Sequence, residues 1–322
     1  MVLIGFHASH EQLAPSTLLE AVQGAERAGF DVAMCSDHFA PWGLAQGESG
    51  FAWSWLGAAL ATTSLRLGVV TAPGQRYHPA ILAQAAATLA EMFPGRFWAA
   101  LGSGEAINEH ITGTGWPGKA YREQRLRESA DVMRRLIAGE TVDHDDAVVV
   151  HAARVWSRPA VAPPLLGAAV SAETARWVAG WADGLITVGS DPEQVARVVG
   201  AYRDGGGDGV VALQVHLCLA ASRAEGLAIA ADQWRHATTP PERMWDVAQP
   251  EEFDRLADPG DLATLEQAVI IESDAVRMAA RLAELAEAAG ADELYLHEVD
   301  TDQETFLRRA ADELLPALKE AT

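Results

Sequence analysis

Cysteine is scarce in this sequence, and its two copies lie far apart. Cys35 and Cys218 each sit in an apolar run of a 322-residue chain, with no CxxC or Cys/His spacing around them. A disulfide framework is dense in cysteine, and a thiolate metal site has Cys or His ligands at characteristic spacings. The pattern therefore predicts two buried free thiols in a reducing compartment, which points to the cytoplasm.

Positive charge is also in short supply. The chain has 24 Lys and Arg against 45 Asp and Glu, for a net charge of -21. This average field repels nucleic-acid phosphates and anionic lipid headgroups. No stretch approaches the roughly 18 apolar residues that cross a bilayer, and the amino-terminal MVLIGFHASHEQ lacks the basic region of a signal peptide. We therefore expect a cytoplasmic protein with no nucleic-acid and no membrane partner.

Short apolar runs alternate with stretches of helical period along the whole chain. The runs have the length of buried parallel strands, and alanine, leucine and charged residues recur at three and four positions in the stretches between them. Eight strands alternating with helices predict a TIM (β/α)8 barrel. The expected strands are 2–6, 30–36, 65–72, 96–102, 164–170, 182–189, 211–220 and 293–299; the expected helices are 15–29, 50–63, 79–93, 121–138, 171–181, 191–204, 222–236, 273–289 and 301–319.

Two segments break this rhythm. Residues 140–163 resemble a small hairpin followed by prolines, and residues 237–268 are polar and proline-rich, with a short helix at best. Neither holds enough apolar residues for a core of its own. We therefore expect one barrel domain over 1–322 that carries insertions at about 140–163 and 237–268.

Polar residues follow several of the expected strands. In a barrel of this type the chemistry lies where strands end and βα loops begin. Asp37, His38 and Trp42 follow the second strand. An imidazole beside a carboxylate is a candidate proton-transfer group, and the alternative is a hydrogen-bonded structural histidine. Trp42 is a candidate pocket wall, and the alternative is a surface-loop anchor.

Glu105 and Glu109 follow the fourth strand, four residues apart, so both are expected on one side of a helical turn. One would bind a ligand and the other would catalyse. The alternative is that both carboxylates only stabilise the first helical turn through the helix dipole. Gly102 and Gly104 allow close backbone approach, but the dinucleotide fingerprint is absent. The histidines show no metal-ligand spacing, so no metal is expected.

The motifs SDHFAPW, RYHPA, FPGRFWAALGSGEAINEH, RLRES and WADGLITVG resemble segments of the luciferase-like superfamily of flavin and deazaflavin oxidoreductases, in particular the glucose-6-phosphate dehydrogenases that use coenzyme F420. GFHASHEQ, SGFAWSWLGAA and PGQRYHPA resemble more closely a subfamily described as flavin-dependent and not using F420. The resemblance covers nearly the whole chain. It implies a homodimer whose cofactor is F420 or FMN.

The resemblance also implies roles for particular residues. His38, Trp42 and Glu109 match the catalytic histidine, tryptophan and glutamate, and Asp37 would contact the cofactor or orient His38. The bond between Val69 and Val70 matches a cis peptide that backs the ring. The remaining positions implied to contact the cofactor are Gly102, Ser103, Gly104, Glu105, Asn108, Ala168, Ala169 and Ser171.

Two departures from the dehydrogenases bear on the substrate. Asp191 stands about where those enzymes have a lysine for the sugar phosphate, and Ala169 and Val170 replace a glycine pair at the cofactor phosphate. We therefore expect hydride transfer between F420 or FMN and an uncharged small alcohol or carbonyl compound, such as a sugar. The alternatives are a two-component FMN monooxygenase that needs a flavin reductase, and a non-catalytic flavin-binding protein.

Overall fold

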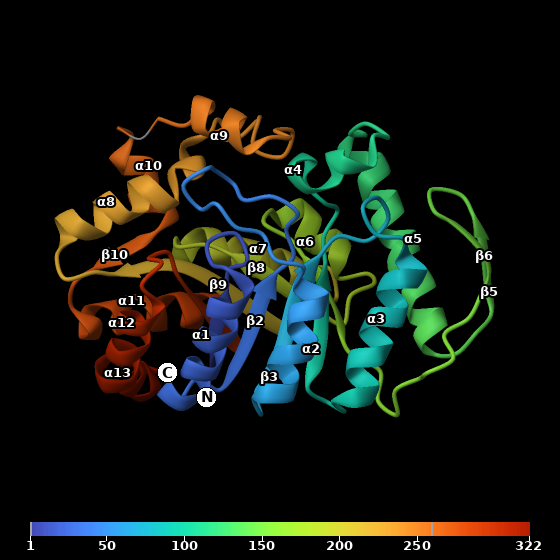
Figure 1. Ribbon diagram of the computed structural model, residues 1–322, viewed down its shortest axis with the longest axis horizontal. Coiled ribbons are helices and arrows are strands. Elements are labelled where there is room, and N and C mark those ends of the chain that lie inside the picture. Colours follow the sequence, from blue (N-terminus) through green and yellow to red (C-terminus); the bar gives the residue numbers. More distant parts are fainter. Residues whose placement is uncertain (1, 259) are drawn as a thin grey trace.

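Eight parallel strands close into a barrel in the computed structural model, which describes residues 2–258 and 260–322 (Figure 1). Each pairs in parallel with its neighbours in the order β9-β11-β1-β2-β3-β4-β7-β8, and pairing of β8 with β9 closes the ring. The predicted TIM barrel is confirmed. The strands are β1 (Leu3–Ala8), β2 (Val32–Ser36), β3 (Arg66–Thr71), β4 (Phe97–Leu101), β7 (Leu165–Ala168), β8 (Gly184–Val188), β9 (Val210–Leu219) and β11 (Glu293–Glu298).

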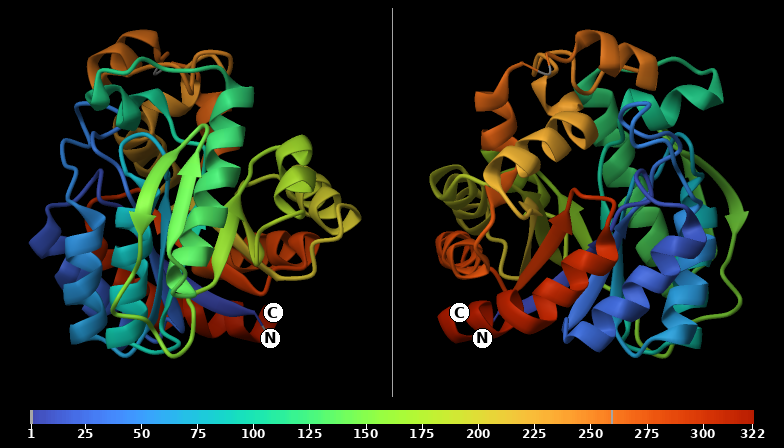
Figure 2. Two further views of the ribbon diagram at one scale, coloured as in Figure 1. Left: turned by 90° about the vertical axis from the view of Figure 1, so that its right-hand side faces the viewer. Right: turned by 60° about the vertical axis from the view of Figure 1, so that its left-hand side comes forward.

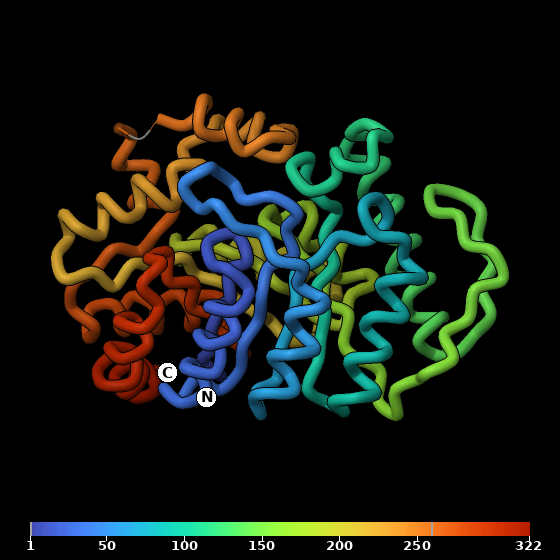
Figure 3. Tube along the Cα trace, in the orientation of Figure 1, coloured from blue at the N-terminus to red at the C-terminus, as the bar shows by residue number. Residues whose placement is uncertain are grey.

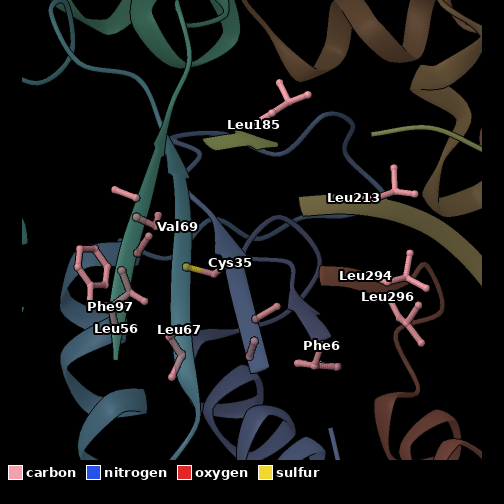
Figure 4. Close-up of a cluster of buried hydrophobic side chains, with 14 of the residues drawn as sticks. Phe6, Cys35, Leu56, Leu67, Val69, Phe97, Leu185, Leu213, Leu294 and Leu296 are labelled. Atoms are coloured by element: carbon pink, nitrogen blue, oxygen red, sulfur yellow. The ribbon is translucent and has the colours of Figure 1, made fainter. Parts of the chain in front are cut away.

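Both faces of these strands are buried, which explains why they appear in the sequence as continuous apolar runs. Alternate side chains point outward and pack under the surrounding helices, as Leu67 and Val69 of β3 do (Figure 4). The residues between them point inward, where Trp98 and Tyr295 fill the lower part of the barrel. The barrel is therefore a packed core, with Glu293 bound by Arg66 and Tyr295 at its amino-terminal end and a larger group of polar side chains at its carboxyl-terminal end.

The helices begin and end at residues suited to those positions. Asp191, Ser222 and Asp274 each accept a backbone N–H as N-caps. Gly29 and Gly290 end α1 and α11 in the left-handed conformation. The helices are α1 (Pro15–Ala28), α2 (Ala52–Thr62), α3 (Pro79–Met92), α4 (Ala106–Glu109), α5 (Lys119–Ile137), α6 (Ala172–Val178), α7 (Pro192–Asp204), α8 (Arg223–Gln233), α11 (Ala275–Ala289), α12 (Gln303–Arg309) and α13 (Leu315–Ala321), with a π-helical stretch at Ala310–Leu314.

Residues 140–163 contain the expected hairpin, formed by β5 (Val142–Asp145) and β6 (Val149–Ala153), which lies outside the barrel along α5 (Figure 2). Residues 237–268 hold more structure than a short helix at best, so that expectation is corrected. They contain α9 (Pro250–Leu256) and α10 (Leu262–Ala268), and a ninth strand, β10 (Ile270–Glu272), pairs with β9. Phe253 and Leu265 are fully buried, and these contacts fix the two short helices.

The two chain ends lie together at the amino-terminal end of the barrel, whereas α9 and the loops after β2 and β4 lie at the opposite end (Figure 3). Polar side chains at the carboxyl ends of the strands are therefore far from both termini. Within the described residues, no helix has the length and apolarity needed to cross a bilayer.

Glycine at position 68 is required by packing inside the barrel. A Cβ at Gly68 would lie 2.0 Å from the indole of Trp98. We expect Gly68→Ala to destabilise the fold by about 1–3 kcal/mol or more, because the indole is fully buried and has no room to move. Gly200→Ala is the matched control, since nothing lies within 4 Å of its Cβ in α7, and we expect a gain of about 0.5–1 kcal/mol. Urea unfolding measures both; equal stabilities would contradict the packing argument.

Candidate active site

The inward-facing side chains at the carboxyl ends of the strands divide into two kinds. On β3, β4, β7 and β8 they are small or apolar, namely Val70, Ala100, Ala168 and Val188, with Gly102 directly after β4. On β1, β2, β9 and β11 they are polar and uncharged, namely His7, Ser36, Gln214, His216 and His297. The end of the barrel therefore offers an apolar half suited to a flat ring and a polar half suited to hydroxyl or carbonyl groups.

Asp37 organises the loops after β2 and β3. Its Oδ2 accepts hydrogen bonds from Thr71 Oγ1 at 2.7 Å and Trp53 Nε1 at 3.2 Å, and its Oδ1 accepts one from Tyr77 Oη at 3.0 Å. The Arg76 guanidinium lies 3.5 Å from Oδ1 and donates to the Asp37 carbonyl. Both oxygens of this buried carboxylate thus accept hydrogen bonds from other side chains of the protein, and these bonds fix the backbone that carries His38.

His38 lies between two carboxylates from different loops. Its Nε2 is 3.4 Å from Glu11 Oε1 and 3.5 Å from Glu105 Oε2. Its Nδ1 is buried and has no hydrogen-bond partner among the described residues. Asn108 ties this arrangement together, since its Oδ1 accepts from Phe39 N at 2.8 Å and its Nδ2 donates to Glu105 Oε2 at 3.1 Å. The imidazole is therefore held at the centre of the site with one nitrogen unused by the protein.

The two carboxyl groups beside His38 have opposite pKa shifts. Burial would raise the pKa of Glu11, but the neighbouring His38 and the hydroxyl of Ser36 outweigh it and lower this pKa to about 2. Burial raises the pKa of Glu105, and the attraction of His38 does not cancel that effect. Paired groups with diverging pKa values are the usual arrangement of an acid and a base. Glu11 is ionised here, and Glu105 is disposed to hold a proton.

Glu109 takes different partners from Glu105. Glu105 is the N-cap residue of α4 and Glu109 is its last residue, four positions on. The Glu109 Oε2 accepts from Arg76 N at 2.5 Å, and its Oε1 lies 3.7 Å from Arg76 Nε. Burial raises its pKa, and Arg76 opposes this. Glu105, predicted to contact the cofactor, is the glutamate of α4 that lies beside His38. The catalytic role predicted for Glu109 stays a prediction.

Trp42 is held by the segment that covers the site. Its ring stacks on His236 with centroids 5.2 Å apart, meets the edge of Phe253 at 5.3 Å, and lies 5.0 Å from the His38 ring. His236 precedes α9, and Phe253 belongs to it. Trp42 therefore lies beside His38, held by His236 and Phe253, and its role as a pocket wall stays a prediction.

The other predicted contact positions gather around the apolar half. Gly102 N donates to Thr71 O, and a Cβ at Gly102 would be 3.8 Å from that of Ala168. Gly104 has φ +85°, which suits the turn into α4. Ser103 is partly buried between these glycines, Ala169 is buried beyond β7, and the Ser171 hydroxyl accepts from Thr174 N as the N-cap of α6.

The expected cis peptide between Val69 and Val70 is not present. No peptide bond among the described residues is cis. Both valines pair in regular register with Cys35 and Ser36 on one side and with Ala99 and Ala100 on the other. The ladder of β3 runs straight to Thr71 without a bulge, so this expectation was wrong.

Several residues of the site were not predicted as members of it. Glu11, Arg76 and Tyr77 lie in motifs noticed for their resemblance, but no role was assigned to them. Gln214 and His297 lie inside strands, where sequence gives only alternation. A polar residue at an inward position of an otherwise apolar strand is the feature that identifies them. The members missed are Glu11, Gln12, Arg76, Tyr77, Gln214, His216, Trp234, His236 and His297.

The fold and site define an α/β-barrel enzyme with a partly buried histidine between two carboxyl groups at the carboxyl ends of its strands. The sequence pattern of the family Bac_luciferase, described as "Luciferase-like monooxygenase", matches residues 1–293. The chain belongs to this family and is a luciferase-like oxidoreductase, as the motifs predicted.

Individual relatives agree with this assignment. An F420-dependent glucose-6-phosphate dehydrogenase of Beutenbergia cavernae is 33% identical over 330 residues, covering 99% of this chain and 98% of the relative. The structure of an F420-dependent secondary alcohol dehydrogenase in complex with an F420-acetone adduct is 28% identical, with TM-score 0.88 over 98% of this chain and 99% of that one. The monooxygenase RslO1 from Streptomyces bottropensis shares 21% identity and TM-score 0.70 over 98% and 99%, which shows the fold alone.

Proposed function

We propose that this protein is an F420-dependent dehydrogenase that interconverts an uncharged alcohol and its carbonyl compound. The observation that carries the proposal is His38 Nε2 lying between the carboxyl groups of Glu11 and Glu105, whose pKa values shift in opposite directions, next to a floor of small apolar side chains. The F420-dependent relatives support F420 over FMN.

The residues around the apolar half fit a flat tricyclic ring. Val70, Gly102 and Ala168 form a floor without polar atoms in their side chains, and the buried Nδ1 of His38 has no protein partner. When bound there, a deazaflavin accepts or returns a hydride at its ring. The chain itself supplies orientation and proton transfer.

The anionic tail of F420 requires a donor beyond the ring site. The hydroxyl of Ser171, a predicted contact, is already used as an N-cap. A cavity of about 430 Å³ next to Glu109 is lined by Gln75, Gly115, Trp116, Tyr121 and Arg125. The Arg125 guanidinium donates a hydrogen bond to Gln75 and carries a positive charge that can bind a phosphate or carboxylate. We assign the tail to this cavity.

The proton of the substrate hydroxyl moves to Nε2 of His38 in the direction of oxidation. The ionised Glu11 stabilises the resulting imidazolium, and Ser9 and Ser36 hold Glu11 by hydrogen bonds of 2.8 and 2.6 Å. Glu105, oriented by Asn108, is the candidate acid on the other side of the imidazole, because burial raises its pKa. Trp42 and the covering segment limit access of water to these charges.

The proposed substrate differs from that named for the glucose-6-phosphate dehydrogenases. A sugar phosphate needs a cation, and Asp191 stands where those enzymes have a lysine. Its carboxylate accepts from Glu193 N as the N-cap of α7. A negative charge at this place opposes a phosphate dianion. The site therefore favours a neutral substrate.

Titration with three cofactors tests the proposal. We expect F420 to bind more tightly than the deazaflavin ring without its tail, and both to bind more tightly than FMN, as followed by fluorescence. Arg125→Gln should weaken binding of F420 about tenfold, as expected for one charge-assisted contact, and leave the tail-free ring unaffected. Tight binding of FMN alone would instead favour the monooxygenase alternative, which needs a partner reductase.

We also propose that two copies associate through one flank of the barrel. Phe51, Ile81, Met92, Val149 and Trp156 are large apolar residues exposed on or next to α2, α3 and the β5–β6 hairpin, which follow one another across one flank with α5 before the hairpin (Figure 1). His78 Nε2 contacts Val149 O and so joins α3 to the hairpin. Exposed large apolar residues gathered on one flank are typical of an interface. Light scattering should give twice the chain mass of 34.3 kDa. Ile81→Asp places a charge in the proposed interface, so the measured mass of this variant should be that of a single chain.

A further inference from the structure

A chain of hydrogen bonds with a fixed direction crosses the polar half of the barrel end. Gln12 Nε2 donates to Val299 O at 2.8 Å and to Gln233 Oε1 at 3.2 Å, which leaves its Oε1 as the acceptor that meets His297 Nε2 at 2.9 Å. A carbonyl oxygen only accepts, so the Gln12 amide has one possible orientation. His297 must therefore carry its proton on Nε2.

The direction continues through Gln214. Because the neutral His297 has its proton on Nε2, its Nδ1 accepts, and Gln214 Nε2 lies 3.3 Å from it. The second N–H of the same amide meets His216 Nε2 at 3.2 Å. His216 in turn is hydrogen-bonded to the backbone of Ala268. With Gln214 donating to both rings, each imidazole accepts at one nitrogen, which is the arrangement that two neutral rings require.

Burial supports this state. It lowers the pKa of His216 to about 4, and it lowers the pKa of His297 far below its usual value, with His7, His216 and His236 adding to the effect. The rings of His7 and His297 stack at 4.2 Å. The histidines of the polar half are therefore neutral, and the negative charge nearest to them is the Glu11 carboxylate.

One atom of the chain remains available to a ligand. Both N–H groups of Gln214 are used, and its Oε1 takes no hydrogen bond from any residue that the structure describes. Gln214 is only partly buried, and it points inward on the same face of β9 as Ala212. The polar half thus offers an oriented acceptor that cannot rotate to become a donor.

Aromatic rings connect this acceptor with the reacting end. Successive ring centroids are 5.0 Å apart from His38 to Trp42, 5.2 Å from Trp42 to His236, 4.8 Å from His236 to Trp234 and 4.7 Å from Trp234 to His297. In the ring of strands, β11 and β1 separate β9, which carries Gln214, from β2, which precedes His38. A substrate that contacts both side chains is therefore several carbon atoms long.

We propose that Gln214 Oε1 selects substrates by accepting a hydrogen bond from a second hydroxyl, remote from the reacting carbon. The inference rests on the proposed function and narrows its substrates to neutral polyols, diols and sugars. A substrate without that hydroxyl leaves Gln214 Oε1 without a hydrogen-bond donor. An anionic group at the same place is repelled by the lone pairs of that oxygen and finds no cation there.

Matched alcohols test the selection. Pentane-1,4-diol and hexane-1,5-diol carry the same secondary alcohol as 2-pentanol and 2-hexanol, with one remote hydroxyl added. We expect kcat/KM to favour at least one diol by about tenfold or more over its partner, and Gln214→Leu to abolish that ratio. Gln249→Leu, an exposed glutamine that contacts His110, is the control and should keep it. A ratio that Gln214→Leu leaves intact overturns the proposal.

A second measurement does not depend on turnover. Long-range 15N spectra of the protein without cofactor should show His216 with its proton on Nδ1 and His297 with its proton on Nε2. Adding the preferred diol should shift the side-chain amide resonances of Gln214, whereas the matching monoalcohol should not. The opposite tautomers, or no shift with either diol, would refute the inference. Loss of F420 turnover with these spectra intact would refute the proposed function alone.

Discussion

His38→Asn is expected to lower kcat for alcohol oxidation by about 10²–10⁴-fold, the range typical of a lost proton-transfer group. The imidazole is the group that can take the hydroxyl proton between Glu11 at 3.4 Å and Glu105 at 3.5 Å. An asparagine amide fills part of the same space but does not accept a proton near neutral pH. Steady-state loss of the absorbance of oxidised F420 measures the effect.

The binding of cofactor should change much less than kcat in this variant. The apolar floor of Val70, Gly102 and Ala168 stays intact, so we expect the Kd for F420 to remain within about threefold, a difference of less than 1 kcal/mol. His151→Asn is the matched control, because its side chain is 98% exposed on the hairpin and distant from the barrel end. Equal kcat for the His38 variant and the wild type would remove His38 from the mechanism.

The barrel could be predicted from sequence because its strands are buried on both faces. Each such strand appears as an apolar run, and helical period separates one run from the next. The ninth strand, Ile270–Glu272, escaped this pattern because three residues are too few to show a period. It pairs with β9 outside the ring, directly after α10, and this tertiary position is not encoded in its three residues.

The position of the site was predictable, but its pairing of side chains was not. Asp37, His38, Trp42 and Asn108 follow strands that end at the same edge of a barrel. Which glutamate faces His38 depends on Arg76, which comes from the loop after β3 and draws Glu109 to itself. Spacing along one helical turn carries no information about that contact.

The directed chain through Gln214 lies further from what sequence can give. It depends on β9 and β11 being neighbours in a register that sets His216 opposite His297. In the chain, β10 lies between β9 and β11, yet β9 and β11 pair directly in the barrel. That pairing follows from closure of the whole sheet. The inward polar residues can be identified in the sequence. The direction of their hydrogen bonds is set by the backbone of Val299 at one end of the chain of bonds and of Ala268 at the other.

Glu105→Gln and Glu109→Gln together decide which carboxyl group takes part in catalysis. We expect Glu105→Gln to lower kcat by about 10²-fold or more, because glutamine keeps the contact with Asn108 but holds no transferable proton. Burial raises the pKa of Glu105, so the acid form persists to higher pH and is lost as pH rises through that pKa. The wild type should therefore lose activity on the alkaline side, and the variant should lack that limb in its pH profile of kcat.

Glu109→Gln should act on stability more than on catalysis. It replaces the carboxylate that accepts from Arg76 N and lies 3.7 Å from Arg76 Nε, and the loss of this buried contact should cost about 1–3 kcal/mol of unfolding free energy. Its kcat should stay within about tenfold, or roughly 1.4 kcal/mol, of the wild type. A larger loss of kcat in the Glu109 variant than in the Glu105 variant would restore the assignment made from the sequence. It would also mean that the carboxylate beside His38 serves only to hold Asn108 and the loop after β2.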